Sequence, residues 1–203
     1  RITPLLNEFE LARDAATQVA TQPGGRVRLT ASVAFGQEVI VPHITALCAA
    51  LPEIELELML SDQTVDLVAV QGDIAVRLAP APKGDLISTR LMRTQYRVVA
   101  APTYIDTQGA LATPQDLAQR DCLRMTLPEY RTEWRFQRDF HETVVDVTGR
   151  ILISNALALR AAARAGVGPA LRADWMVDRD IAKGRLVDLF PDHAATATTY
   201  DTA

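Results

Sequence analysis

The sequence predicts an α/β fold in which helices cover both faces of a largely parallel sheet. Short β-rich runs alternate with amphipathic helix patterns along most of the 203 residues. Strands that alternate with helices indicate βαβ units, because parallel neighbours need a crossover between them. An apolar content of 48% with 23% charged residues is that of an ordinary globular protein. A chain of this length can bury a large core as one domain or as two small lobes.

The first expected element is an amphipathic helix. From Pro4 to Val19, apolar residues recur at spacings of three and four, with charged residues between them. The cluster Pro23-Gly24-Gly25 ends this pattern, because proline and glycine do not continue a helix. Such a helix could pack on its own domain or pair with a partner chain. The abrupt break favours the second interpretation.

Alternating strands and helices follow. A β-rich run from Val27 to Ala31 precedes a helix pattern from about Gln37 to Ala50. Glutamates that alternate with Ile, Leu and Met predict a strand from Ile54 to Leu60. A helix from Val65 to Val70 then leads into a short apolar strand from Ile74 to Leu78.

A second set of elements begins after the strand patterns from Leu86 to Arg93 and from Tyr96 to Ala100. It comprises a short helix opening at Pro102, a helix start at Thr113-Pro114, strands from Cys122 to Thr126 and Asp146 to Ile153, helices from Ala156 to Ala165 and Asp174 to Ile181, and a strand from Leu186 to Leu189. Ser154 or Asn155 can cap the alanine-rich helix, and Gly166-Val167-Gly168 is a good stop for it.

Net charge and hydropathy limit the expected partners. A formal charge of −4 and a pI near 5.4 do not supply a basic face that could neutralise phosphates. Any DNA contact is therefore expected outside these residues. No run approaches the roughly 18 apolar residues of a membrane span, and the first 22 residues lack a signal-peptide core. We therefore expect a cytoplasmic protein without a membrane partner.

The two cysteines indicate neither a metal site nor a disulfide. Cys48 lies in an apolar helix pattern, and Cys122 stands just before a strand pattern. There is no CxxC motif and no Cys/His cluster, so we expect both thiols to fill the core of a reduced protein. No cofactor or metal is expected.

Catalytic motifs are weak. His43, His141 and His193 stand in unrelated contexts, and no GxSxG, HExxH or phosphate-loop motif occurs. Glu55 and Glu57 alternate on a strand and indicate a solvated face rather than an acid/base pair. We therefore nominate no catalytic residue.

Strand-to-helix junctions are the more informative feature. The chain leaves a strand for a helix after Ala31, after Leu60 and at Ser154-Asn155. In open parallel sheets the ligand crevice lies beyond the carboxyl ends of the strands, where helix N-termini offer free N–H groups. These junctions predict a cleft for a small polar or anionic molecule. Alternatively, each hydroxyl or amide caps its own helix.

Several motifs, in order and spacing, resemble the effector-binding domain of LysR-type transcriptional regulators. They are residues 25–32 with Phe35-Gly36 and Val41-Pro42, residues 51–58 with Leu60-Ser61-Asp62, residues 71–78, residues 98–104, residues 114–117, residues 155–162 and residues 165–168. The resemblance covers nearly the whole chain, and it rests on the collinearity of the fragments rather than on any one of them.

The resemblance implies a fold like that of type 2 periplasmic-binding proteins. Two Rossmann-like lobes would be joined by two crossing segments, near Val99 to Ala101 and near Gly168 to Ala170. Residues 1–22 would form a linker and dimerisation helix, residues 23–99 and 169–203 the first lobe, and residues 100–168 the second. The family continues at both ends, with a winged helix-turn-helix before the linker and with a strand and a helix after Ala203.

The resemblance also implies a small-molecule effector bound between the lobes. Matching positions nominate Ser32, Val33, Asp62, Arg77, Ala101, Pro102, Met125, Thr126, Asn155 and Gly168. Arg77 could pair with a ligand carboxylate or form a structural salt bridge. The carboxylate of Asp62 disfavours the binding of a highly anionic ligand, unless Asp62 contacts a hydroxyl or an amine of that ligand.

Two residues depart from the family's pattern. Pro169 and Arg172 occupy a stretch that is normally an uninterrupted apolar strand. Proline removes a donor from a strand ladder and Arg172 adds a charge near the second expected crossing, so hinge mechanics or ligand choice could differ.

The function implied is that of a sensor within a regulator. An effector would alter DNA binding by a winged helix-turn-helix outside these residues, in a homodimer or homotetramer, with RNA polymerase as a further candidate partner. The first alternative is a periplasmic solute-binding protein of a transporter, which shares the fold but needs an export signal. An enzyme on a similar fold is the second alternative, and no motif supports it.

Overall fold

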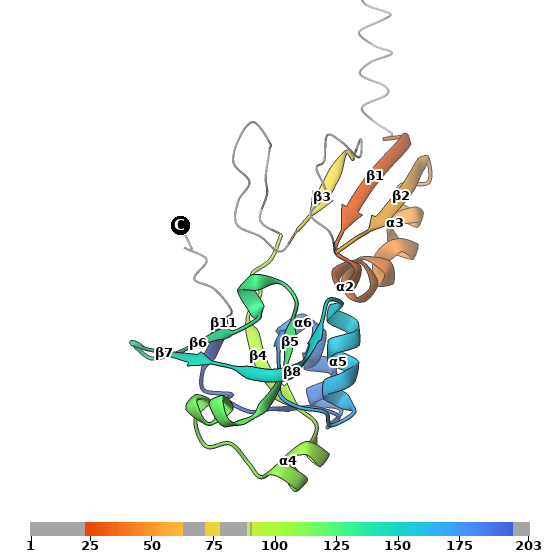
Figure 1. The fold of residues 1–203 in the computed structure, drawn as a ribbon. Helices are drawn as coiled ribbons and strands as arrows, with labels where there is room; N and C mark the ends of the chain where they lie inside the picture. Colours follow the sequence, from red (N-terminus) through yellow and green to blue (C-terminus); the bar gives the residue numbers. More distant parts are fainter. Residues whose placement is uncertain (1–22, 63–71, 78–88, 90, 197–203) are drawn as a thin grey trace, which may run out of the picture. The chain divides into compact units, whose positions relative to one another are not determined.

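The computed structural model describes residues 23–62, 72–77, 89 and 91–196 (Figure 1). The chain divides into two compact units, residues 1–78 and 79–203. The expected linker helix, the expected helix from Val65 to Val70 and half of the expected strand from Leu86 to Arg93 lie outside the described residues. The last three residues of that strand, 91–93, have no strand structure.

The first unit contains a three-stranded parallel sheet. Its strands are β1 (Gly25–Ala31), β2 (Ile54–Leu60) and β3 (Ile74–Val76), in the order β2-β1-β3. Ala31 pairs with Leu60 on one side and with Val76 on the other. All three strands therefore end at the same edge, as the βαβ pattern predicted.

One continuous helical stretch connects β1 to β2. It consists of α2 (Val33–Phe35), the π-helical turn η1 (Gly36–Ile40), the 3-10 turn η2 (Val41–His43) and α3 (Ile44–Ala50). The helix begins four residues earlier than predicted, because the N–H of Gly36 already donates to the carbonyl of Ser32 at 2.9 Å. Gly36 is buried, and a Cβ there would overlap the side chain of Leu60. A glycine at this position thus lets the helix pack closely on β2.

By length and composition this helix could also cross a membrane, which the sequence analysis did not anticipate. Residues Val33–Ala50 have a mean hydropathy of 1.4 over 18 residues, of which 17% are buried. The helix is, however, the crossover between two parallel, hydrogen-bonded strands, and such a crossover belongs to a βαβ unit. Its buried residues are Ala34, Phe35 and Gly36 in its first turns, so the described residues leave most of its apolar surface uncovered.

The second unit is built on an eight-stranded mixed sheet. The strands are β4 (Tyr96–Ala100), β5 (Asp121–Met125), β6 (Glu133–Arg138), β7 (His141–Asp146), β8 (Thr148–Ile153), β9 (Ala170–Ala173), β10 (Val187–Asp188) and β11 (Ala194–Thr196). Their order is β7-β6-β11-β4-β9-β5-β8, and β10 pairs with β4. Only the β5–β8 and β5–β9 pairs are parallel. The expectation of a parallel sheet therefore holds for this part of the unit alone.

The predicted strand from Asp146 to Ile153 is broken at Val147. Before this residue β7 pairs with β6, and after it β8 pairs with β5. Val147 is buried and donates its N–H to the carbonyl of Thr132 at 2.7 Å. The chain bends here because it changes its pairing partner.

Local cap signals predicted the ends of the helices well. The helices of the second unit are α4 (Pro102–Gln108), the 3-10 turns η3 (Pro114–Gln119) and η4 (Pro128–Tyr130), α5 (Ala156–Arg164) and α6 (Asp174–Ala182). Gly166 ends α5 at φ 79°, and the N–H groups of Gly166 and Val167 donate to the carbonyls of Ala163 and Ala162. This pair of bonds is a Schellman motif, so the predicted stop is confirmed.

The core of the second unit lies between β4, β9 and the β6–β7 hairpin. Trp134, Phe136 and Leu117 are almost completely buried there, and the ring of Phe136 packs edge-on against Phe190 at 5.6 Å between centroids. Burial of such side chains contributes roughly 1.5–3 kcal/mol each. This core fixes the hairpin against the central strands.

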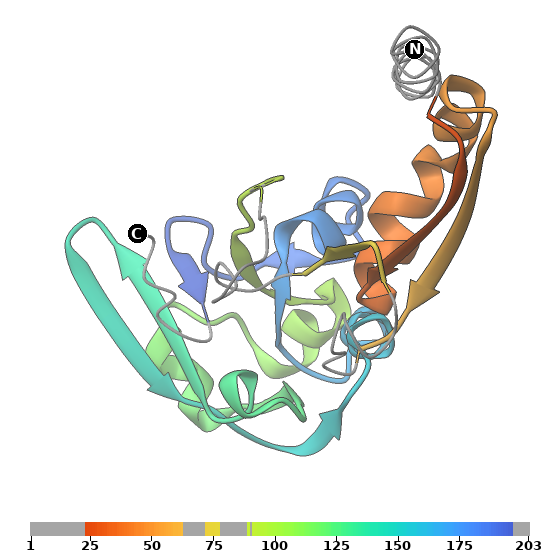
Figure 2. The ribbon, with the colours of Figure 1, turned by 90° about the horizontal axis from the view of Figure 1, so that it is seen from above.

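The C-terminal part of the chain, from residue 169 on, is placed differently from our expectation. We expected residues 169–203 to rejoin the first lobe, but β9, β10 and β11 all pair with β4 in the second unit (Figures 1 and 2). The strand β4 itself, expected in the first lobe, belongs to this sheet as well. Both expected crossings therefore fall inside the second sheet, since antiparallel pairing with β4 holds these strands there.

The same placement explains the two unusual residues near the second expected crossing. Pro169 precedes the first residue of β9, so its missing N–H removes no ladder bond, and its carbonyl accepts from Leu123 at 2.8 Å. Arg172 is buried within β9, and this burial lowers its pKa to about 10. The guanidinium donates through Nε to the carbonyl of Leu171.

One of the two cysteine predictions was wrong. Cys122 is buried, and its Sγ lies 3.7 Å from the carbonyl of Leu117. Cys48, however, is exposed on α3, a helix that contains no buried residue. An apolar helix pattern says that one face is apolar, but it does not say whether that face is covered.

We expect Gly168→Ala to lower the free energy of unfolding by about 1–3 kcal/mol, the usual cost of overpacking. The reason is that a Cβ at this position would overlap the carbonyl oxygen of Asp121. Urea denaturation measures the effect. Ala165→Ser, at an exposed position beside the same turn, is the control and should stay within about 0.5 kcal/mol. An unchanged stability of Gly168→Ala would contradict this close approach.

Candidate functional site

The carboxyl edge of the first unit's sheet brings together the nominated residues of that unit. Ser32 and Val33 follow β1, Asp62 lies two residues after β2, and Arg77 follows β3. The register aligns the last residues of all three strands. Residues from three segments that are far apart in sequence therefore lie at one edge, as a ligand site after parallel strands requires.

Asp62 is held at the start of the helix that follows β1. Its Oδ1 accepts the N–H of Val33 at 3.0 Å, and the N–H of its neighbour Ser61 donates to the carbonyl of Ala31 at 2.9 Å. A carboxylate at a helix N-terminus is stabilised by the free N–H groups and by the helix dipole. Asp62 thus has a structural role, and its negative charge is partly balanced by that dipole.

The hydroxyl of Ser32 is available for a ligand. Ser32 occupies the N-cap position of α2, but its side chain makes no capping bond, since Asp62 supplies the acceptor. The residue is half-buried. A nominated polar group at the edge is therefore not used by its own helix.

Arg77 provides a positive charge at the same edge. Its Nη2 donates to Thr30 Oγ1 at 2.9 Å and its Nη1 to the carbonyl of Val76 at 3.0 Å. Partial burial lowers the pKa of this guanidinium. Within the described part of the chain, Arg77 forms no ion pair, so the structural salt bridge that we considered is not found there. Neutral partners orient the side chain without neutralising it.

Three nominated residues of the second unit lie at the carboxyl ends of β5 and β8. Met125 pairs with Ile153, and the N–H of Thr126 donates to the carbonyl of Ile153 at 3.3 Å. Asn155 follows two residues later, and its Oδ1 accepts the N–H groups of Leu157 and Ala158 at 3.1 and 2.9 Å. Asn155 is therefore confirmed as the cap of α5.

The other three nominated residues lie at the opposite end of the same sheet. Ala101 and Pro102 follow β4, which runs antiparallel to β9, and Gly168 precedes β9 and lies against Asp121 at the start of β5. The two ends of β5 are about 13 Å apart, at about 3.3 Å per residue. Ala101, Pro102 and Gly168 therefore do not form one site with Met125, Thr126 and Asn155.

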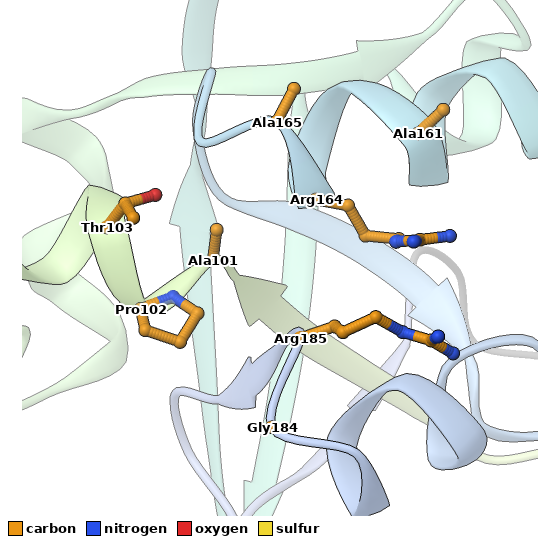
Figure 3. Close-up of a pocket in the computed structure, with 8 residues that line it drawn as sticks. All are labelled: Ala101, Pro102, Thr103, Ala161, Arg164, Ala165, Gly184 and Arg185. Carbon is orange, nitrogen blue, oxygen red and sulfur yellow. The ribbon is translucent and has the colours of Figure 1, made fainter.

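Ala101 and Pro102 instead line a hollow of about 610 Å³ within the second unit. Figure 3 shows its other lining residues, which are Thr103 from α4, Ala161, Arg164 and Ala165 from the end of α5, and Gly184 and Arg185 after α6. Small side chains leave the space open, and two guanidiniums lie at one end of it. The sequence analysis missed this hollow, although the spacing of Ala161, Arg164 and Ala165 places them on one helix face.

A single buried carboxylate, Asp180 on α6, holds the arginines near this hollow. Nε and Nη2 of Arg185 both lie 2.6 Å from its Oδ1. Nε of Arg164 lies 3.8 Å from the same oxygen, and Nε of Arg160 lies 3.9 Å from Oδ2. The side chain of Asp180 is 4% exposed, and a buried carboxylate of this kind needs such partners.

The described residues contain no group that suggests catalysis or metal binding. No three His, Cys, Asp or Glu residues among them are placed to hold a metal ion. Burial raises the pKa of the Cys122 thiol to about 12, which disfavours a reactive thiolate. His43, His141 and His193 lie on η2, on β7 and after β10. The three histidines are therefore on separate elements.

We expect Asn155→Ala to lower the free energy of unfolding by about 0.5–2 kcal/mol, because two N–H groups at the start of α5 lose their acceptor. Asn155→Asp keeps an acceptor oxygen and should retain most of the stability. Urea denaturation of both variants measures the difference. If the two substitutions cost the same, the cap is not the main role of this side chain.

Comparison with known proteins adds independent information. Residues 20–201 match the family model described as the LysR substrate binding domain. The HTH-type transcriptional regulator PtxR of Pseudomonas aeruginosa is 31% identical over 191 residues, which are 92% of this chain and 60% of that protein. The HTH-type transcriptional regulator DmlR of Escherichia coli is 29% identical over 198 residues, 97% of this chain and 64% of that protein. The chain thus spans less than two thirds of each relative.

Solved structures agree at the level of the fold. The regulatory domain of CrgA, a LysR-type transcriptional regulator from Neisseria meningitidis, is 24% identical, with a TM-score of 0.76 over 86% of this chain and 89% of that one. The full-length virulence activator AphB of Vibrio cholerae is 24% identical, with a TM-score of 0.79 over 96% of this chain and 66% of that one. These likenesses confirm the expected α/β fold of the type 2 periplasmic-binding-protein class.

Proposed function

Because this chain belongs to the LysR substrate-binding-domain family, we propose that it is the effector-sensing part of a LysR-type transcriptional regulator. The observation that carries the proposal is the convergence of Ser32, Asp62 and Arg77 at the carboxyl edge of a parallel sheet. The relatives PtxR and DmlR are named as transcriptional regulators. DNA would be bound by a winged helix-turn-helix outside these residues, since the chain itself has a net charge of −4.

The chemistry of the edge suggests what the effector carries. The guanidinium of Arg77, held on neutral partners, suits a carboxylate. The hydroxyl of Ser32 and the carboxylate of Asp62 suit a hydroxyl or an amine. We therefore favour a small carboxylate that also bears a hydroxyl or amino group. Met125, Thr126 and Asn155 would contact it from the second lobe.

Sensing in this scheme requires no chemistry on the effector. The ligand would bind between the lobes and stabilise one relative arrangement of them, which linker helices would transmit to the DNA-binding heads. A ligand can do so only through different affinities for the two arrangements, typically by about 1–3 kcal/mol. The regulator would act in the cytoplasm as a homodimer or homotetramer, with RNA polymerase as a further partner.

The helix between β1 and β2 offers a surface for subunit pairing. Its second half, α3, contains no buried residue, and Val41 just before α3 is 46% exposed. An apolar face of this kind that the described residues leave uncovered is typical of an interface. We propose that this face contributes to the contact between subunits.

Two alternatives make different predictions about the gene. A periplasmic solute-binding protein would carry an export signal before residue 1, whereas a regulator would carry a helix-turn-helix there. The curated relatives are named as transcriptional regulators, which argues against the first alternative and also against an enzyme. The full-length coding sequence decides between a regulator and a periplasmic solute-binding protein. Turnover of an effector by the purified chain would favour an enzyme.

We expect Ser32→Trp to abolish effector binding by filling the edge of the first sheet, while the fold remains intact. A thermal-shift screen of the chain against a metabolite library identifies binders, because a ligand that binds only the native state raises stability by mass action. Each hit is then repeated on Ser32→Trp and on Thr148→Trp, a control at an exposed position at the end of β8 away from Asn155, which should leave the binding unchanged. If a compound causes the same thermal shift in Ser32→Trp as in the unchanged chain, its binding site lies elsewhere.

We expect Arg77→Met to weaken the binding of carboxylate hits at least tenfold, since the carboxylate loses its charged partner. Arg77→Lys keeps the charge but not the planar fork, so it should restore only part of the affinity. Isothermal titration measures both variants. Uncharged hits should bind the unchanged chain and both variants with the same affinity. Carboxylates that bind both variants as tightly as the unchanged chain would contradict the assigned role of Arg77.

A further inference from the structure

The hollow beside Arg164 and Arg185 lies at the edge of the second unit opposite to Met125, Thr126 and Asn155. From its charge and shape we propose that it is a second site, which binds the phosphate or carboxylate group of a small molecule. This inference goes beyond the proposed function, which places an effector at the other edges of the sheets.

The first argument is the shape of the hollow. Its volume of about 610 Å³ falls within the range of about 300–1,000 Å³ that is typical of small-molecule sites. The walls come from the start of α4, the last turn of α5 and the turn after α6 (Figure 3). Ala101, Ala161 and Gly184 are too small to fill the space between these elements. Three elements that are separate in sequence thus border an open hollow of useful size.

The second argument is the balance of charge. Two guanidiniums, those of Arg164 and Arg185, line the hollow at the same end (Figure 3). Both rely on the same carboxylate, that of Asp180, which Arg160 also approaches. One carboxylate cannot neutralise two guanidiniums. The end of the hollow therefore carries a positive charge that an anion would balance.

The third argument is the hydrogen-bonding capacity of Arg164. Arg185 donates to Asp180 through Nε. Arg164 approaches the same oxygen only at 3.8 Å, which is too long for a hydrogen bond. Among the described residues, the guanidinium of Arg164 has no hydrogen-bond partner. A guanidinium has five N–H donors in a planar fork that matches carboxylate and phosphate groups.

The remaining wall indicates a ligand of mixed character. The methyl groups of Ala161 and Ala165 and the ring of Pro102 are apolar, and Thr103 adds one hydroxyl. An anionic group would lie against the arginines, and a compact carbon skeleton would lie against the alanines. A metabolite with one phosphate or with two carboxylates has this chemistry.

The test measures the binding of two probes, inorganic phosphate and succinate, to the 203-residue chain. Titrations are carried out by thermal shift and by calorimetry, with sodium chloride at matched ionic strength as the reference. The test variant is Arg164→Met, because the Arg164 side chain is 41% exposed and, among the described residues, its only ion pair is the long contact to Asp180. The control is Arg150→Met on β8 of the same unit, where Arg150 is 85% exposed and pairs with Asp121.

We expect at least one probe to bind more tightly than chloride, to lose affinity tenfold or more in Arg164→Met and to change less than twofold in Arg150→Met. Tighter binding of phosphate assigns a phosphate group to the ligand, and tighter binding of succinate assigns a dicarboxylate. Ala161→Phe fills the hollow without changing its charge and should weaken the binding of the same probe.

Three results would overturn the proposal. The first is that neither probe binds more tightly than chloride. The second is that Arg164→Met and Arg150→Met weaken binding equally. The third is that Ser32→Trp abolishes binding. The last result would assign the anion to the edge of the first sheet instead. Retention of probe binding in Ser32→Trp, together with loss in Arg164→Met, separates this site from the effector site.

Discussion

Strand β1 pairs in parallel with β2 on one side and with β3 on the other, and the site of the first unit depends on this pairing. Parallel strands that are in register end together, so the residues that follow them meet at one edge. Asp62 then lies close enough to accept the N–H of Val33, which frees the hydroxyl of Ser32 from capping. Arg77 lies close enough to donate to Thr30. A shift in register would remove both contacts.

In the second unit the corresponding constraint is the antiparallel pairing of β4 with β9. It reverses the direction of β4 relative to β5 and β8, and this reversal sends Ala101 and Pro102 to the end of the sheet away from Thr126. The family resemblance had grouped these residues in one site. The helix α5 connects the two ends, because Asn155 caps its start and Arg164 lies in its last turn.

The sequence allowed accurate prediction wherever the deciding interactions are local. The cap of α5 and the stop at Gly166 depend on residues within one turn; the stop was predicted, and the cap was narrowed to Ser154 or Asn155. So were β2 and β4 with their full bounds, because alternation and β-branched residues define a strand locally. The convergence of the junctions at Ser32 and Asp62 also followed, since parallel βαβ units fix which strand ends meet. Arg77 was nominated by the family resemblance alone, because the predicted strand ran on to Leu78, whereas β3 ends at Val76.

What the sequence did not reveal depends on long-range pairing and on burial. The positions of β9, β10 and β11 beside β4 follow from hydrogen bonds between residues about 75 to 100 positions apart, as the pairs Tyr96–Ala173 and Tyr96–Ala195 show, and no local pattern specifies such a partner. Exposure of Cys48 depends on what covers α3, which its own apolar pattern cannot show. The sequence analysis did not single out Arg164, whose significance arises only because Asp180 and Arg185, from another helix and its turn, lie beside it. Since Asn155 caps the start of α5 and Arg164 lies in its last turn, an anion on Arg164 and a ligand near Asn155 would both act on the same helix.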